Sequence, residues 1–95
     1  MTFEAFDASL SGVEPPAGLS AYLNALWHDA TGDWGKAHQI VQDIETAQAS
    51  AIHAYLHRKE GDESNARYWY GRAGRSFPTG KTLDEEWKLL VNELL

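Results

Sequence analysis

The four histidines are the side chains of this sequence best suited to chemistry near neutral pH, because imidazole titrates there and binds metal ions. His53 and His57 stand four residues apart in the segment HAYLH. On a helix this spacing puts both rings on one face, where they can hold a metal together with a carboxylate. Ala54 occupies the place of the glutamate base in the H-E-x-x-H metalloprotease motif.

A second interpretation of the histidines is purely structural, and the sequence favours it. His28 and His57 occupy equivalent places in two similar segments, where each ring would pack against its neighbouring helix. There the rings would hydrogen-bond to a backbone group or an acid. The metal site of His53 and His57 is therefore the alternative, and no cofactor is expected.

The segment ARYWYGRAGR, residues 66–75, contains a second group of candidate residues. If it is a helix, its inward face consists of Ala66, Trp69, Tyr70 and Ala73. Arginine and tyrosine are enriched at binding hot spots, and arginine binds carboxylates through two parallel hydrogen bonds. The predicted binding face consists of Tyr68, Arg72 and Arg75, joined by Arg67 and Arg58. The alternative is a solvated face with weak local ion pairs to Glu60, Asp62 or Glu63.

Other kinds of catalytic site find no support in the sequence. There is no cysteine, and no Gly-x-Ser-x-Gly motif marks a serine nucleophile. The acids at 84–86 suit the first turn of a helix, where they favour its dipole. The glycines at 32 and 35 lack the strand before them and the Gly-Lys-Ser/Thr ending of a phosphate loop. A non-catalytic protein is expected.

The helices that position these residues are predicted from a repeated sequence motif. Residues 28–37 read HDATGDWGKA and residues 57–66 read HRKEGDESNA, sharing His, Gly, Asp and Ala at the same places 29 residues apart. Glycine ends a helix in the left-handed conformation, and aspartate caps the next helix. Each copy therefore predicts two antiparallel helices joined by a tight turn.

Apolar spacing predicts about five helices and no strand. The first is expected to start at Pro15-Pro16, because proline suits the first turn of a helix, and the second follows Asp33. Thr46 would cap the third helix, although one long helix over 33–59 is an open alternative. The fourth helix is lined by Ala66, Trp69, Tyr70 and Ala73, and the capping box TLDE at 82–85 begins the fifth.

The predicted fold is a single all-α domain over residues 1–95, made of two antiparallel hairpins and a C-terminal capping helix. Residues 1–13 have apolar side chains at helical spacing, and either dock as a short helix or stay loose. A length of 95 residues suits one domain with a single core.

Charge and hydropathy narrow the choice of partners. The net charge of −6 argues against nucleic acid as a partner, because phosphate binding rests on clustered positive charge. No apolar run approaches the ~18 residues of a membrane span, and the acidic start of the chain does not resemble a targeting peptide. A soluble, cytoplasmic protein is expected. Residues 1–33 carry five acids and no base, whereas 58–75 is locally basic, which favours an acidic partner or self-association.

Two segments, LWHDATGDWGKAHQIV and LHRKEGDESNARYWYGRAG, resemble tetratricopeptide repeat hairpins over residues 17–75. A small residue seven places before Gly-Asp and an alanine five places after that glycine fit the pattern in both. The period of 29 differs from the ~34 residues of the family, and the closing proline is absent. The chain also resembles small bacterial all-helical proteins of uncharacterised function with a similar YWYxRAG segment.

The resemblance implies a module that binds another protein. Together with the basic stripe, it predicts a non-catalytic interaction module that binds a protein or an acidic peptide, or that self-associates. The alternative is a small enzyme, or a protein that binds a metal or an anionic ligand, using His53 and His57.

Overall fold

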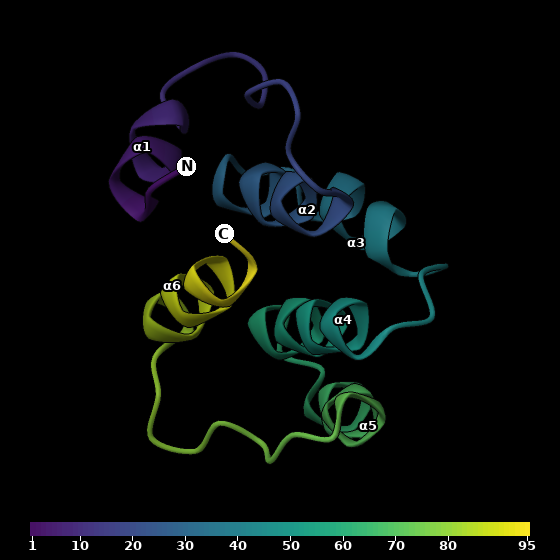
Figure 1. The fold of residues 1–95 in the computed structure, drawn as a ribbon. Coiled ribbons are helices and arrows are strands. Elements are labelled where there is room, and N and C mark those ends of the chain that lie inside the picture. Colours follow the sequence, from purple (N-terminus) through teal and green to yellow (C-terminus); the bar gives the residue numbers. More distant parts are fainter.

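The computed structural model describes all residues from Met1 to Leu95 and consists of six helices without a strand (Figure 1). The helices are α1 (Phe3–Ser9), α2 (Ala21–Ala30), α3 (Trp34–Val41), α4 (Ala47–Lys59), α5 (Glu63–Ala73) and α6 (Leu83–Leu94). The prediction of an all-α fold is confirmed. The additional helix is α1, so the N-terminal segment docks as a short helix. No helix is long and apolar enough to cross a membrane.

Two predicted boundaries are settled by side-chain caps. The helix expected at Pro15-Pro16 begins instead at Ala21, because the Ser20 hydroxyl accepts a hydrogen bond from the backbone of Leu23 and both prolines lie in the preceding loop. Residues 33–59 form two helices. The Thr46 side chain caps α4 as predicted, and its hydroxyl lies 3.0 Å from the Tyr22 hydroxyl of α2.

The repeated Gly-Asp motif forms the same turn between two helices at both of its positions. Gly32 and Gly61 have φ values of 93° and 88°, in the left-handed region where a side chain is strained. The following Asp33 and Asp62 each cap the next helix by accepting a backbone N–H three residues on. These two turns bring α3 back against α2 and α5 back against α4.

Helix α4 is the centre of the molecule, lying between the α2–α3 pair and α5 (Figure 1). Every residue from Ala49 to His57 is buried, because the helix is covered on several sides. A helix that is hydrophobic on every side is normally buried inside a protein. Helix α4 is buried in this way although it carries two histidines. Those polar groups must therefore find partners within the fold.

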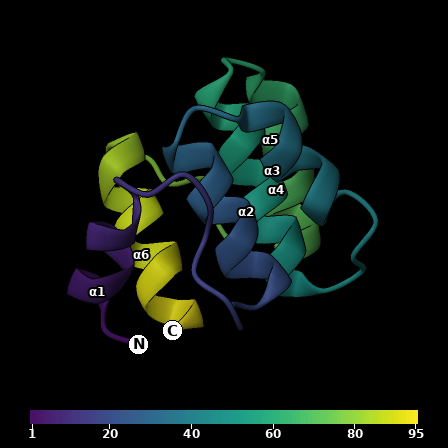
Figure 2. The same cartoon turned by 90° about the horizontal axis from the view of Figure 1, so that it is seen from above.

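Helices α1 and α6 lie side by side at the other end of the molecule (Figure 2). The Trp87 ring of α6 packs against Phe3 and Phe6, with ring centres 6.1 and 6.0 Å away. Its indole N–H donates to the carbonyl oxygen of Leu26 on α2, at 3.1 Å. Trp87 thus ties both ends of the chain to the core.

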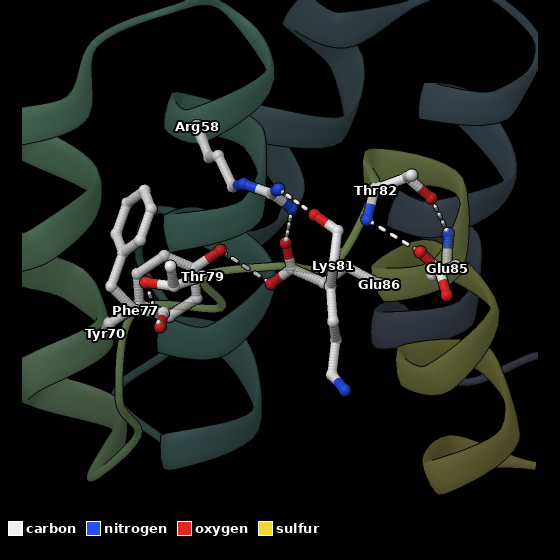
Figure 3. A network of polar contacts seen from close by, with 8 residues as sticks. All are labelled: Arg58, Tyr70, Phe77, Thr79, Lys81, Thr82, Glu85 and Glu86. Atoms are coloured by element: carbon white, nitrogen blue, oxygen red, sulfur yellow. Dashed lines mark hydrogen bonds and ion pairs between the residues drawn. The ribbon is translucent and has the colours of Figure 1, made fainter.

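A buried polar network joins α4, α5 and α6 (Figure 3). Glu86 of α6 accepts hydrogen bonds from Arg58 at 2.8 Å and from the Tyr70 hydroxyl at 2.6 Å. Arg58 also donates to the carbonyl oxygen of Lys81. Burial and the bond to Glu86 raise the pKa of Tyr70. The network therefore fixes the loop after α5 against the core.

Candidate functional site

Three histidines from two helices converge on one point. His38 comes from α3, whereas His53 and His57 come from successive turns of α4. One ring nitrogen of each lies within 4.8 Å of the corresponding atoms of the other two. We call these residues the histidine cluster. The α2–α3 turn makes it possible, because it lays α3 along the face of α4 that carries both rings.

Two tryptophans flank the histidine cluster. Trp34 stacks on His38 with ring centres 4.9 Å apart, and its indole N–H donates to the Leu56 carbonyl oxygen at 2.8 Å. Trp69 of α5 stacks on His53, with 4.0 Å between the ring centres and 16° between the planes. These contacts hold the imidazoles in fixed orientations between flat aromatic walls.

The tautomer of His57 follows from its partners. Its Nδ1 lies 2.6 Å from a carboxylate oxygen of Glu60. An ionised carboxylate only accepts hydrogen bonds, so Nδ1 carries the proton that faces Glu60, and in a neutral ring Nε2 keeps its lone pair. Asn65 approaches Nε2 with its side-chain nitrogen at 3.4 Å, a long contact. A carboxylate on the far nitrogen of a ligating histidine is the usual partner in protein metal sites.

Burial keeps two members of the histidine cluster neutral at pH 7. Burial and then the nearby His38 and His57 lower the pKa of His53 to about 4. The same causes, burial first and then His57, lower the pKa of His38, against a smaller opposite effect of Glu60. Neutral imidazoles have a free lone pair, so no proton has to leave these two rings before a metal binds.

The cluster offers three nitrogen donors and no carboxylate donor. Metal sites with three protein ligands leave a coordination position for water or another ligand. The carboxylates of Glu60 and Asp62 also lie near His57, but Glu60 binds the ring and Asp62 caps α5. The arrangement therefore suits a transition metal ion with an open position.

The sequence identified two of these three residues. His53 and His57 were recognisable by their spacing, whereas the expected third ligand was a carboxylate and not His38. No local signal points to His38, because only the packing of α3 on α4 brings it there. His28, which matches His57 in the repeat, lies outside the cluster, with its ring edge-on to Trp27 at 5.3 Å.

The predicted arginine face is divided by ion pairs. Arg58 points inward to Glu86, Arg75 pairs with Glu93 at 2.5 Å, and Arg67 pairs with Glu63 at 3.3 Å. Of the four arginines, only Arg72 has no carboxylate partner. Its guanidinium donates to the hydroxyl of the exposed Tyr68 at 3.0 Å and lies 5.4 Å from the centre of the Trp69 ring.

A cleft of about 350 Å³ lies elsewhere, among α1, α2, α4 and α6. Its wall contains the buried Asp29, whose Oδ1 accepts from Lys59 at 3.0 Å and whose Oδ2 has no partner. Burial and the nearby Asp29 raise the pKa of Tyr55 on the same wall. Its charged groups are largely paired with one another, so this cleft presents a weaker case for a site than the histidine cluster.

No protein-family model, curated protein or solved structure matches this chain. The function is therefore argued from the residues and their geometry.

Proposed function

We propose that this protein binds a divalent transition metal ion through His38, His53 and His57. The observation that carries the proposal is the convergence of three imidazole nitrogens, within 4.8 Å of one another, from two packed helices. Imidazole donors suit zinc, copper and nickel, whereas calcium and magnesium require oxygen donors. Zn²⁺ is the probe of choice, because three histidines and an open position suit its tetrahedral geometry.

The surroundings of the histidine cluster support the proposal independently. Glu60 orients His57, and Trp34 and Trp69 orient His38 and His53. A ligand set whose ring orientations are already fixed loses little conformational freedom when the metal binds. The low pKa of His53 leaves this donor unprotonated well below neutral pH.

The test is calorimetric titration of the purified protein with Zn²⁺, in wild type and in His38→Ala. We expect one ion per chain in wild type and at least a tenfold loss of affinity in the variant, since one of three donors is gone. His28→Ala is the matched control, because His28 lies outside the cluster, and it should bind as wild type does. Equal binding by all three proteins, or no binding by wild type, contradicts the proposal.

A protein-interaction module is the second candidate, favoured by the exposure of Tyr68 and by the lack of a carboxylate partner for Arg72. The identical Gly-Asp turns of the two helix pairs support the further proposal that they form tetratricopeptide-like hairpins. An acidic peptide or a second copy of the chain would be the partner. This function would be supported if wild type captured a partner in a salt-sensitive way. The double variant Arg72→Ala/Arg75→Ala should then fail to capture it.

A further inference from the structure

The cleft among α1, α2, α4 and α6 has a buried carboxylate oxygen without a partner in its wall. Its volume of about 350 Å³ is at the small end of the ~300–1,000 Å³ range of ligand pockets, and it is partly open to solvent. Asp29 of α2 lines the cleft and is only 2% exposed. Its Oδ1 accepts from Lys59, whereas its Oδ2 accepts nothing. A ligand that brings a donor to this oxygen relieves the cost of leaving it unpaired.

The neighbours of Asp29 indicate that its carboxylate faces the cleft. Lys59 and Tyr55, both of α4, line the cleft and lie close to this carboxylate. Burial and then the proximity of Asp29 raise the pKa of Tyr55, so the phenol stays neutral at pH 7. The Tyr55 hydroxyl makes no hydrogen bond of regular geometry with Oδ2. This oxygen therefore remains an open acceptor beside the cleft.

The charges that line the cleft favour a cation as its occupant. Its wall contains three carboxylates and two ammonium groups, which belong to Asp7, Asp29, Asp84, Lys59 and Lys88. Lys88 pairs with Asp84 at 3.0 Å, so both lysines are already engaged. The carboxylate of Asp7, which is exposed on α1, has no ion-pair partner. The uncompensated charge of the cleft is therefore negative.

Apolar side chains form the rest of the cleft wall. They come from α1, α2 and α6 and are Leu10, Ala30, Leu83 and Trp87. Ligand pockets typically combine such apolar walls with a few polar groups that fix the orientation of the ligand. A cation that suits this cleft therefore has an apolar body beside its charge.

We propose that the cleft binds a small organic cation, a primary amine with an apolar body, whose ammonium group donates to Oδ2 of Asp29 while Asp7 adds a second negative charge. An ammonium group suits this position, since it has three donors and no acceptor. Its hydrogen bond to a carboxylate is of the stronger, charge-assisted kind. The site is separate from the histidine cluster and requires no metal.

The experiment follows the backbone amide signals of the isotope-labelled full chain by NMR, with a chelator present. The protein is titrated with 2-phenylethylamine, a cation at neutral pH, and with 2-phenylethanol, which has a similar shape without the charge. We expect the amine to bind about tenfold more tightly, since a charge-assisted hydrogen bond is worth more than a neutral one. The amide signals of Asp29, Ala30 and Leu83 should move.

Two variants test the carboxylates. Asp29→Asn keeps the shape of the side chain and removes its charge, so the preference for the amine should disappear. Asp7→Asn changes an exposed residue and should reduce the preference about twofold. It decides the matter if Asp29→Asn does not fold. Glu4→Gln is the matched control, because Glu4 is an exposed acid of α1 that does not line the cleft. It should retain the full preference.

Equal binding of the amine and the alcohol by wild type, or a preference unchanged in the Asp29 and Asp7 variants, overturns the proposal. Signals that neither compound moves overturn it as well, because water is then the only partner left for Oδ2. Shifts centred on the histidine cluster would place the amine elsewhere and refute the assignment to this cleft.

Discussion

At the scale of single residues, the histidine cluster combines neutral donors with fixed orientation. Trp34 stacks on His38, Trp69 stacks on His53 and Glu60 lies against His57, so every ring has a partner that orients it. Burial, followed by the proximity of the neighbouring rings, disfavours protonation of His38 and His53. The burial that disfavours protonation also makes the stability of the metal-free protein depend on pH.

Stability of the metal-free protein should fall as the pH drops from about 6.5 to about 4, in part because of His53. The folded-state pKa of His53 is lowered, so the unfolded chain binds more protons in this range and is favoured by acid. Urea denaturation with a chelator present, at neutral pH and near pH 4, should show a smaller loss in His53→Gln than in wild type. His38 and His57 lie next to the His53 ring and are not substituted in that comparison. An equal loss in both proteins would contradict the prediction.

Glu60 should contribute to metal affinity without touching the metal. Glu60→Ala removes the acceptor that orients His57, and we expect a loss of Zn²⁺ affinity of about 10- to 100-fold. Glu60→Gln retains an oxygen acceptor for Nδ1, so its loss should be smaller. Competition with a coloured chelator measures both variants. Wild-type affinity in Glu60→Ala would show that the carboxylate has no orienting role.

At the scale of elements, the polar network around Glu86 should stabilise the fold more than the exposed ion pairs do. Glu86→Ala leaves the mostly buried guanidinium of Arg58 and the Tyr70 hydroxyl without their acceptor. We expect a loss of about 3 kcal/mol in the free energy of unfolding. The control Glu63→Ala removes an exposed pair with Arg67 and should cost less than about 1 kcal/mol. Similar losses in chemical denaturation would contradict this difference.

Alanine substitution should change the stability in opposite directions at Gly61, in the turn before α5, and at Gly71, inside α5. Gly61 has a φ of 88°, so Gly61→Ala should cost about 1–2 kcal/mol through backbone strain. Gly71 lies inside α5 with ordinary helical geometry and open space around it. Gly71→Ala should therefore stabilise the protein by about 0.5–1 kcal/mol, because alanine favours the helix. Thermal unfolding of the two variants gives the signs directly.

At the scale of the whole molecule, loosening the end formed by α1 and α6 should leave the histidine cluster on α3 and α4 intact. Phe6 is fully buried against Trp87, so Phe6→Ala should cost about 3 kcal/mol and release α1. Limited proteolysis should then cleave the loop between α1 and α2 faster than in wild type. Zn²⁺ affinity should stay the same, since the histidine cluster lies on α3 and α4. A parallel loss of affinity would show that docking of α1 supports the site.

The sequence alone predicted those features that depend on residues close together in the chain. The Gly-Asp turns and the Thr46 and Thr82 caps are all present. Each depends on a hydrogen bond or a φ angle within a few residues, and such interactions leave a local pattern. The start of α2 was wrong by a few residues, because the Ser20 cap outweighed the preference of proline for a first turn.

Tertiary packing decided everything that depends on residues distant in the chain. His38 joins His53 and His57 only because α3 lies against α4, and Arg58 is withdrawn from the predicted binding face because α6 brings Glu86 to it. Neither contact leaves a periodic signal, since each joins helices whose relative placement is set by the packing of the core. The sequence thus determined the helices and their turns, whereas the tertiary structure determined which polar side chains meet, because desolvated groups pair with whatever partner the packing provides.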